Sequence, residues 1–149
     1  MKRELVGAIV LDILPALAVS LLYYLLLGYR RDYLGHFAAG YGATLTATAL
    51  LLAIVVTALS PDQFRHIVPS IAVAATVLCI GAGAVTEATI FRFAKFDEID
   101  FCNQSLGAVI AGVVAIAIAG EAKSTGPTFR WAVATGIVFV LVGAYFAFS

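Results

Sequence analysis

Five long apolar runs constrain this chain more than any other feature of its sequence. Each run is close to or above the roughly 20 residues that an α-helix needs to cross the hydrocarbon of a bilayer. They are rich in Ala, Leu and Val and lack the two-residue alternation of membrane β-strands. The sequence therefore predicts an all-α fold, an integral membrane bundle of five transmembrane helices. The predicted spans are Leu5–Gly28, Tyr33–Ser60, Ile67–Phe91, Phe101–Gly120 and Phe129–Phe148.

The composition excludes the main soluble classes of protein. Of the 149 residues, 62% are hydrophobic and 12% are charged, whereas soluble domains have about 45–50% apolar and roughly 25% charged residues. Nine basic residues balance nine acidic ones, so the chain lacks the positive surface that nucleic acids attract. No break between the runs is long enough to separate two domains. We therefore expect residues 1–149 to form a single transmembrane domain that contacts membrane lipids and no nucleic acid.

The odd number of spans predicts termini on opposite sides of the membrane. We call the side of the N-terminus the first side, and the side of the break at 29–32 the second side. The first side carries five Lys and Arg residues and the second side carries four, so the positive-inside rule does not fix the orientation. Acidic residues gather on the second side. They are Asp32, Asp97, Glu98 and Asp100.

Three predicted helix ends meet on this second side and bring polar residues together. Asp32 and His36 are one helical turn apart at the start of the second span, and Asp100 and Asn103 have a similar spacing in the fourth. Small residues lie about one turn deeper and favour close helix packing. They are Gly40, Gly83 and Gly107. The candidate polar site consists of Asp32, His36, Glu87, Arg92, Asp97, Asp100 and Asn103.

Glu87 is the sharpest single signal because it lies about one turn inside an apolar run. A carboxylate at that depth needs a partner, a water molecule or a proton, and ionisable residues within membrane spans mark functional sites. We expect Arg92 or His36 to be its partner. Two interpretations remain open, a functional site and a structural clamp that locks three helices together.

Asp12 lies in the other half of the bundle, within the first span. We expect it to face the bundle interior and to pair with Arg130 or a bound water molecule, because a buried charge is usually neutralised by its nearest opposite. Several aromatic residues near the span ends are typical of an interfacial aromatic belt. They are Tyr23, Tyr24, Tyr29, Trp131 and Tyr145.

The second-side residues resemble a known family. The order of Asp32, His36 and Phe37, then Glu87, Arg92 and Asp97, then Asp100, Asn103, Gly107 and Gly112 is similar to that of the VanZ-like family of small bacterial membrane proteins. The resemblance runs from Asp32 to Gly112 and leaves the first and last spans unmatched. The family commonly has Gln three residues after its Glu, where this chain has Ile90. The resemblance implies a role in the bacterial envelope, in the inner membrane, linked in some members to glycopeptide tolerance.

Two functions follow as alternatives. The first is a site for an envelope lipid or a lipid-linked head group, in which carboxylates bind a metal or act as a general base; the metal candidates are His36, Glu87 and Asp100. The second is a non-catalytic accessory subunit of a larger membrane complex, with His36 as a pigment or haem ligand. A transporter fits less well, because the polar residues crowd one surface. The sequence identifies neither a catalytic residue nor a cofactor.

Overall fold

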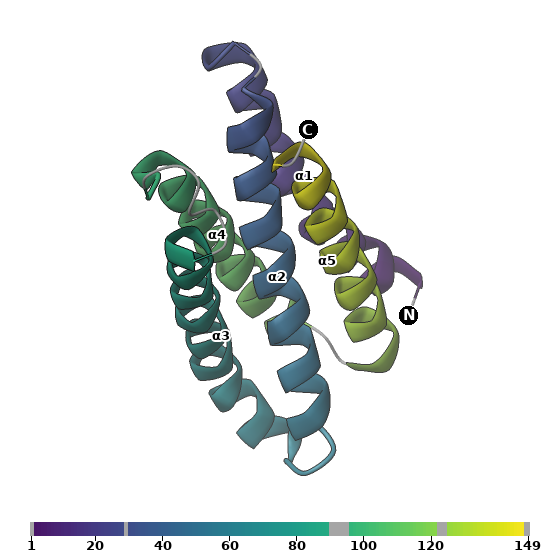
Figure 1. Cartoon of the computed structure of the whole chain (residues 1–149). Helices are drawn as coiled ribbons and strands as arrows, with labels where there is room; N and C mark the ends of the chain where they lie inside the picture. Colours follow the sequence, from purple (N-terminus) through teal and green to yellow (C-terminus); the bar gives the residue numbers. More distant parts are fainter. Residues whose placement is uncertain (1, 29, 90–95, 122–124, 148–149) are drawn as a thin grey trace.

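The computed structural model of the chain is a bundle of five long α-helices (Figure 1), and it describes residues 2–28, 30–89, 96–121 and 125–147. The helices are α1 (Lys2–Leu26), α2 (Arg31–Val55), α3 (Pro61–Thr89), α4 (Glu98–Glu121) and α5 (Thr125–Ala147). No strand occurs among the described residues. Each helix contains a stretch long and apolar enough to cross a membrane. The predicted all-α architecture of five transmembrane helices is confirmed, and the chain is an integral membrane protein.

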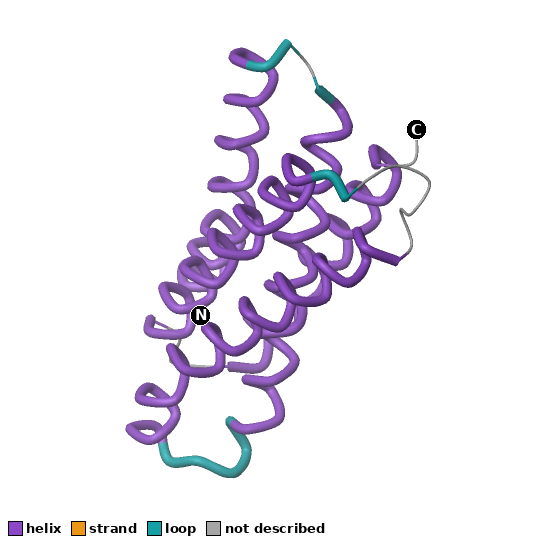
Figure 2. Tube along the Cα trace, turned by 60° about the vertical axis from the view of Figure 1, so that its left-hand side comes forward, coloured by secondary structure: helices purple, strands orange, loops and turns teal. Residues whose placement is uncertain are grey.

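The second helix, α2, is the centre of the bundle. It packs against all four other helices. Half of the residues in its most apolar stretch are buried, whereas 11% of those in the most apolar stretch of α1 are. In Figure 1, α3 and α4 lie to one side of α2 and α5 to the other, while α1 lies behind. Figure 2 shows the same helices running alongside one another as long coils. Side chains on α2 are therefore the ones most able to meet residues of several helices.

Glycine contacts bring α5 very close to α2. The two helices run antiparallel, so that Gly35 lies against Gly143 and Gly42 lies against Gly136. A Cβ atom at any of these positions would overlap main-chain or side-chain atoms of the facing helix. Such small residues allow helix backbones to approach closely in a membrane, where apolar packing contacts replace the hydrophobic effect as the driving force.

Several helix ends differ from the ends of the apolar runs that predicted them. The helix α3 begins at Pro61 rather than near residue 67, after a capping box in which Ser60 and Gln63 exchange hydrogen bonds. The fourth helix begins at Glu98 instead of residue 101, and α2 ends at Val55, before the predicted end of its span. Hydropathy marks the segment that enters hydrocarbon, whereas capping and hydrogen bonding decide where a helix ends.

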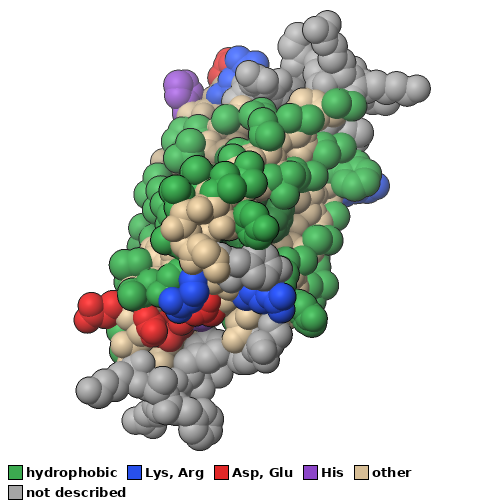
Figure 3. All heavy atoms as spheres, turned by 90° about the horizontal axis from the view of Figure 1, so that it is seen from above, with side chains coloured by type: hydrophobic (Ala, Val, Ile, Leu, Met, Phe, Trp, Pro, Cys, Tyr) green, Lys and Arg blue, Asp and Glu red, His purple; other side chains and the backbone are tan. Residues whose placement is uncertain are grey.

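The surface of the bundle between its ends is apolar. Large side chains along α1, such as Leu14, Leu21 and Leu25, are each more than half exposed. Figure 3 shows hydrophobic side chains covering the area between charged groups at two ends of the face in view. Exposing Leu and Val side chains over such a length is favourable in contact with lipid acyl chains and costs free energy in water. Asp62, Arg65 and His66, at the start of α3, are exposed as expected of a solvated turn.

Candidate functional site at the second side

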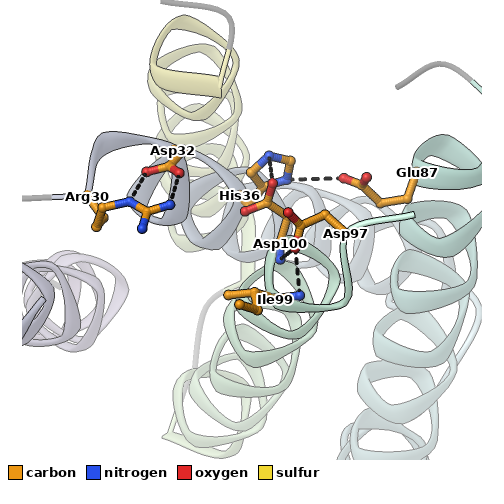
Figure 4. Close-up of polar contacts among 7 residues, drawn as sticks. All are labelled: Arg30, Asp32, His36, Glu87, Asp97, Ile99 and Asp100. Atoms are coloured by element: carbon orange, nitrogen blue, oxygen red, sulfur yellow. Dashed lines mark hydrogen bonds and ion pairs between the residues drawn. The ribbon is translucent and has the colours of Figure 1, made fainter. Parts of the chain in front are cut away.

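A histidine held between two carboxylates forms the centre of the site (Figure 4). The Nδ1 atom of His36 is 3.5 Å from Oε1 of Glu87, and its Nε2 atom is 3.4 Å from Oδ2 of Asp100. The three residues come from α2, α3 and α4, respectively. The predicted meeting of three helix ends is therefore confirmed, and His36 is the partner of Glu87. We call these three residues the acid–histidine cluster.

The acid–histidine cluster is largely removed from solvent. The side chain of Glu87 is 4% exposed, that of His36 is 10% exposed and that of Asp100 is 19% exposed. The cluster places two carboxylates around a single histidine, so it favours a further proton, a cation or hydrogen-bond donors. Oδ1 of Asp100 is buried without a hydrogen-bond donor among the described residues, and Oε1 of Glu87 makes only its 3.5 Å ion-pair contact with His36, which is not a hydrogen bond. This unused acceptor capacity is expensive in a low-dielectric setting and points to a missing partner.

Close packing one turn deeper holds the cluster together. Gly40 of α2 and Gly83 of α3 both lie against Gln104 of α4, the first against its carbonyl oxygen and the second against its side-chain amide. Gly107 lies against the carbonyl oxygen of Phe37. The absence of side chains at these three glycines lets α4 approach both α2 and α3, as their positions in the sequence predicted. Helix packing thus fixes the distances within the cluster.

Asp32 does not join the cluster, although it lies one turn from His36. It forms two hydrogen bonds with Arg30, with N···O distances of 3.1 and 2.6 Å, and both side chains are about half exposed. These bonds raise the pKa of the Arg30 guanidinium above its ordinary value. The guanidinium also lies over the ring of Tyr33, 4.0 Å from its centroid. The pair forms a charged rim beside the cluster (Figure 4) and remains near enough to act electrostatically on Asp100.

Asp97 has a structural role at the start of α4. Its Oδ1 accepts hydrogen bonds from the backbone N–H groups of Ile99 and Asp100, at 2.9 and 3.2 Å. This is the geometry of a helix N-cap, in which a short carboxylate satisfies backbone donors that lack a partner. The cap fixes the first turn of α4, and that turn carries Asp100 into the cluster.

Asn103 faces α1 and not the cluster. Its Oδ1 accepts a hydrogen bond of 2.6 Å from the hydroxyl group of Tyr23, and its Nδ2 is buried without an acceptor among the described residues. Tyr23 was expected in the aromatic belt, but its ring is half-buried and packs edge-on against Phe37. The different direction of Asn103 from that of Asp100 has a geometric cause. Residues three apart on a helix diverge by about 60°, enough to turn Asn103 towards a different neighbour.

Gln104 is the residue near the cluster that the sequence reading missed. It is one turn from Asp100, four residues along α4, and fits between Gly40 and Gly83. The i, i+4 spacing that was applied to Asp32 and His36 would have identified it. The candidate Arg92 lies outside the described residues, as does Ile90.

The cluster does not have the geometry of a metal centre. No group of three or more His, Cys, Asp or Glu side chains in the described part of the chain is arranged to hold a metal ion. The candidates His36, Glu87 and Asp100 do meet, but the two carboxylates face opposite nitrogens of the ring and do not surround a common point. The same geometry disfavours haem or pigment ligation by His36, because both ring nitrogens already face a carboxylate.

The expected pair of Asp12 with Arg130 does not form. It is completely buried, as expected, but neither of its carboxylate oxygens has a hydrogen-bond partner among the described residues. Arg130, the expected partner, is exposed and makes no ion pair with it in the part of the chain that the structure describes. The arginine lies at the first-side end of α5, where water and lipid head groups can solvate its charge.

Comparisons with protein-family models, with curated proteins and with solved structures find no match to this chain. The resemblance of its second-side residues to the VanZ-like family therefore stays a prediction, and the geometry of the site has to carry the functional argument.

Proposed function

We propose that this protein is a VanZ-like protein of the bacterial inner membrane whose acid–histidine cluster binds the polar head group of an envelope lipid or lipid-linked sugar. The observation that carries the proposal is the pair of largely buried carboxylates around His36, whose contacts with this one histidine leave hydrogen-bond acceptor capacity unused among the described residues. The cluster lies at the ends of three membrane-spanning helices. Lipid head groups occupy this depth of a bilayer.

The chemistry of the cluster selects a ligand that donates hydrogen bonds. Ionised Glu87 and Asp100 are acceptors only. Sugar hydroxyl groups and a lipid ammonium group are donors, and bonds to an ionised acceptor are about twice as strong as neutral ones. The rim pair of Arg30 and Asp32 is half exposed beside the cluster. It offers a cation to the phosphate that such lipids carry next to the sugar or amine.

Binding is better supported than catalysis. An imidazole that acts as a general base needs a ring nitrogen free to reach the substrate proton. Both nitrogens of His36 face protein carboxylates. The carboxylates orient the imidazole ring, and no described group is placed as a nucleophile beside it. We therefore assign the cluster to recognition of a head group, with no reaction step.

The proposal is tested with purified protein in a mild detergent. Wild type and Glu87→Gln are compared by native mass spectrometry of retained lipids, and by thermal stability with added phosphatidylethanolamine, phosphatidylglycerol or a polyprenyl-diphosphate sugar. The matched control is Glu98→Gln, an exposed glutamate on the same side of the bundle. We expect Glu87→Gln to lose lipid retention and stabilisation by at least one of these lipids, while Glu98→Gln keeps both.

Two results count against this function. Equal lipid retention by wild type and Glu87→Gln would remove the cluster from head-group binding. Loss of folding in Glu87→Gln, without any lipid effect in a milder Asp100→Asn variant, would favour the clamp interpretation and the alternative of an accessory subunit. A buried pair that loses one partner typically costs about 3–5 kcal/mol, which is large enough to detect as unfolding.

A further inference from the structure

A second polar site, separate from the acid–histidine cluster, lies inside the bundle around Asp12. This residue is 0% exposed, and both oxygens of its carboxylate lack a hydrogen-bond donor among the described residues. It lies on the face of α1 that turns inward, because Ala8 and Ala16, one turn before and one turn after it, are buried too. An unpaired carboxylate at this depth costs several kcal/mol unless something neutralises it.

The central helix α2 carries further buried oxygen atoms on the face that contacts Asp12 through Tyr41. The hydroxyl group of Tyr41 donates a hydrogen bond of 2.7 Å to the backbone carbonyl of Asp12, which fixes the two helices at this depth. Thr44 and Thr48 follow on the same face of α2, and both are 0% exposed with hydroxyl groups that have no partner among the described residues. Because α1 and α2 run in opposite directions, the tilt of the Asp12 side chain towards the start of α1 directs it to the Thr44 turn.

No positive side chain among the described residues lies close enough to balance Asp12. From α4, the residues that pack against this part of α1 are apolar, and they include Val114 and Ile118. From α5, the bundle core beside α1 and α2 receives Ala132 and Val133. Tyr41 of α2 is the titratable group that faces Asp12 among the described residues of the helices packed on α1. No described side chain therefore neutralises the charge of Asp12.

We propose that Asp12 and Thr44 form a buried site for one monovalent cation, supplied either as a proton or as Na⁺. A single positive charge exactly matches one carboxylate in number, whereas a divalent ion would leave an uncompensated charge in the membrane interior. Carboxylate and hydroxyl oxygens are the hard ligands that small alkali ions and protons prefer. Thr48, one turn further, lines a cavity of about 20 Å³ between α2, α4 and α5. This volume has room for one water molecule beside Thr48.

The test measures thermal stability of the detergent-purified protein as a function of cation. In one arm, NaCl replaces choline chloride at constant ionic strength and alkaline pH. In the other arm, pH is lowered in Na⁺-free buffer. We expect wild type to be stabilised in at least one arm, by about 5–10 °C at a cation concentration some 100-fold above its dissociation constant. The arm that responds identifies the source of the charge.

The variant Asp12→Asn removes the negative charge and keeps the shape of the side chain. We expect Na⁺ no longer to raise its thermal stability, and the effect of pH to lose the part that belongs to Asp12. The variant should be at least as stable as wild type without Na⁺. Thr44→Val should weaken the apparent Na⁺ affinity about tenfold if the hydroxyl group is a ligand. Thr46→Val is the matched control, because the Thr46 hydroxyl lies against Gly136 of α5 instead.

Infrared difference spectroscopy of wild type against Asp12→Asn provides a second measurement, because any carboxyl band of the acid–histidine cluster is common to both proteins and cancels. A protonated Asp12 gives a carboxyl carbonyl band in Na⁺-free buffer, and Na⁺ binding abolishes it. If wild type responds in neither arm and shows no such band, the site does not exist. A response that is as large in Asp12→Asn as in wild type would also overturn it. Neither result bears on the acid–histidine cluster, so the two proposals fail independently.

Discussion

Single residues in the acid–histidine cluster depend on one another because they share one imidazole ring. Glu87 of α3 contacts Nδ1 of His36, and Asp100 of α4 contacts Nε2. The helices α3 and α4 pack against each other and against α2, which carries His36. The ring position that suits one carboxylate therefore constrains the other. Removal of either carboxylate should change what the remaining contact contributes to stability.

A double-mutant cycle measures this dependence. We expect Glu87→Gln and Asp100→Asn to be non-additive in the free energy of unfolding, with a coupling of about 0.5–3 kcal/mol. Urea or thermal denaturation of the two single variants and the double variant in detergent gives the value. As a control, Glu87→Gln combined with Asp62→Asn, at the exposed opposite end of α3, should be additive within ~0.5 kcal/mol. Additivity in the first cycle would show that the ring is not shared.

Tyr23 provides a second residue-scale prediction, since it joins α1 to α4. Tyr23→Phe removes the hydroxyl group that donates to Asn103 and leaves the amide oxygen without its donor. We expect a loss of about 1–3 kcal/mol in unfolding free energy. Tyr145→Phe is the control, because that side chain is 69% exposed on α5, and its loss should stay within roughly 0.5 kcal/mol. Equal effects of the two substitutions would contradict an inward role for Tyr23.

At the scale of helices, glycine positions decide how closely the elements approach. Gly40 and Gly83 lie against Gln104 of α4, and Gly107 of α4 lies against α2. Gly42 and Gly136 form a similar close contact between α2 and α5. Gly81 of α3 differs from these, because a Cβ atom there would meet nothing within 4 Å. The same substitution should therefore have opposite effects at packed and open positions.

The pair Gly40→Ala and Gly81→Ala tests this difference. A methyl group at Gly40 overlaps the carbonyl oxygen of Gln104 and forces α4 away from α2, so we expect a destabilisation of about 1–3 kcal/mol. Alanine at Gly81 meets open space and improves helix propensity, so we expect a stabilisation of up to ~1 kcal/mol. Thermal unfolding in detergent measures both. A Gly40→Ala variant as stable as Gly81→Ala would show that α2 and α4 are not in backbone contact.

At the scale of the whole molecule, five spans place the two ends of the described chain on opposite sides of the membrane. The helices α2 and α4 start at the second side, whereas α3 and α5 start at the first. Five Lys and Arg residues on the first side and four on the second leave the direction of insertion weakly determined.

Topology mapping tests this arrangement. We expect reporters fused at the N-terminus and at the C-terminus to lie on opposite sides in every inserted molecule, whichever side faces the cytoplasm. Protease protection of tagged protein in sealed vesicles measures it. Substitution of two first-side basic residues, Arg65→Gln and Arg130→Gln, should shift the population towards the orientation with the second side in the cytoplasm. Reporters found on the same side would exclude a five-span topology.

The sequence by itself determined the number of helices, their order and the ends at which polar residues gather. Hydrophobic length is a local property, and backbone groups in lipid must be hydrogen-bonded within the helix, so a long apolar run has few alternatives. The meeting of His36, Glu87 and Asp100 also followed from topology, because alternate spans begin or end on the same side. The glycines one turn deeper were readable for the same reason.

The tertiary structure alone decided which way each polar side chain turns. Rotation of a helix about its axis is set by packing against its neighbours, and one residue of difference changes the direction by about 100°. Asn103 therefore meets Tyr23 while Gln104 lies below the cluster. Asp97 caps α4, and Asp12 remains without Arg130. Opposite charges suggested a pair of Asp12 with Arg130 from the sequence. Whether such a pair forms depends on the rotation and depth of each helix, and the packing of the whole bundle fixes both.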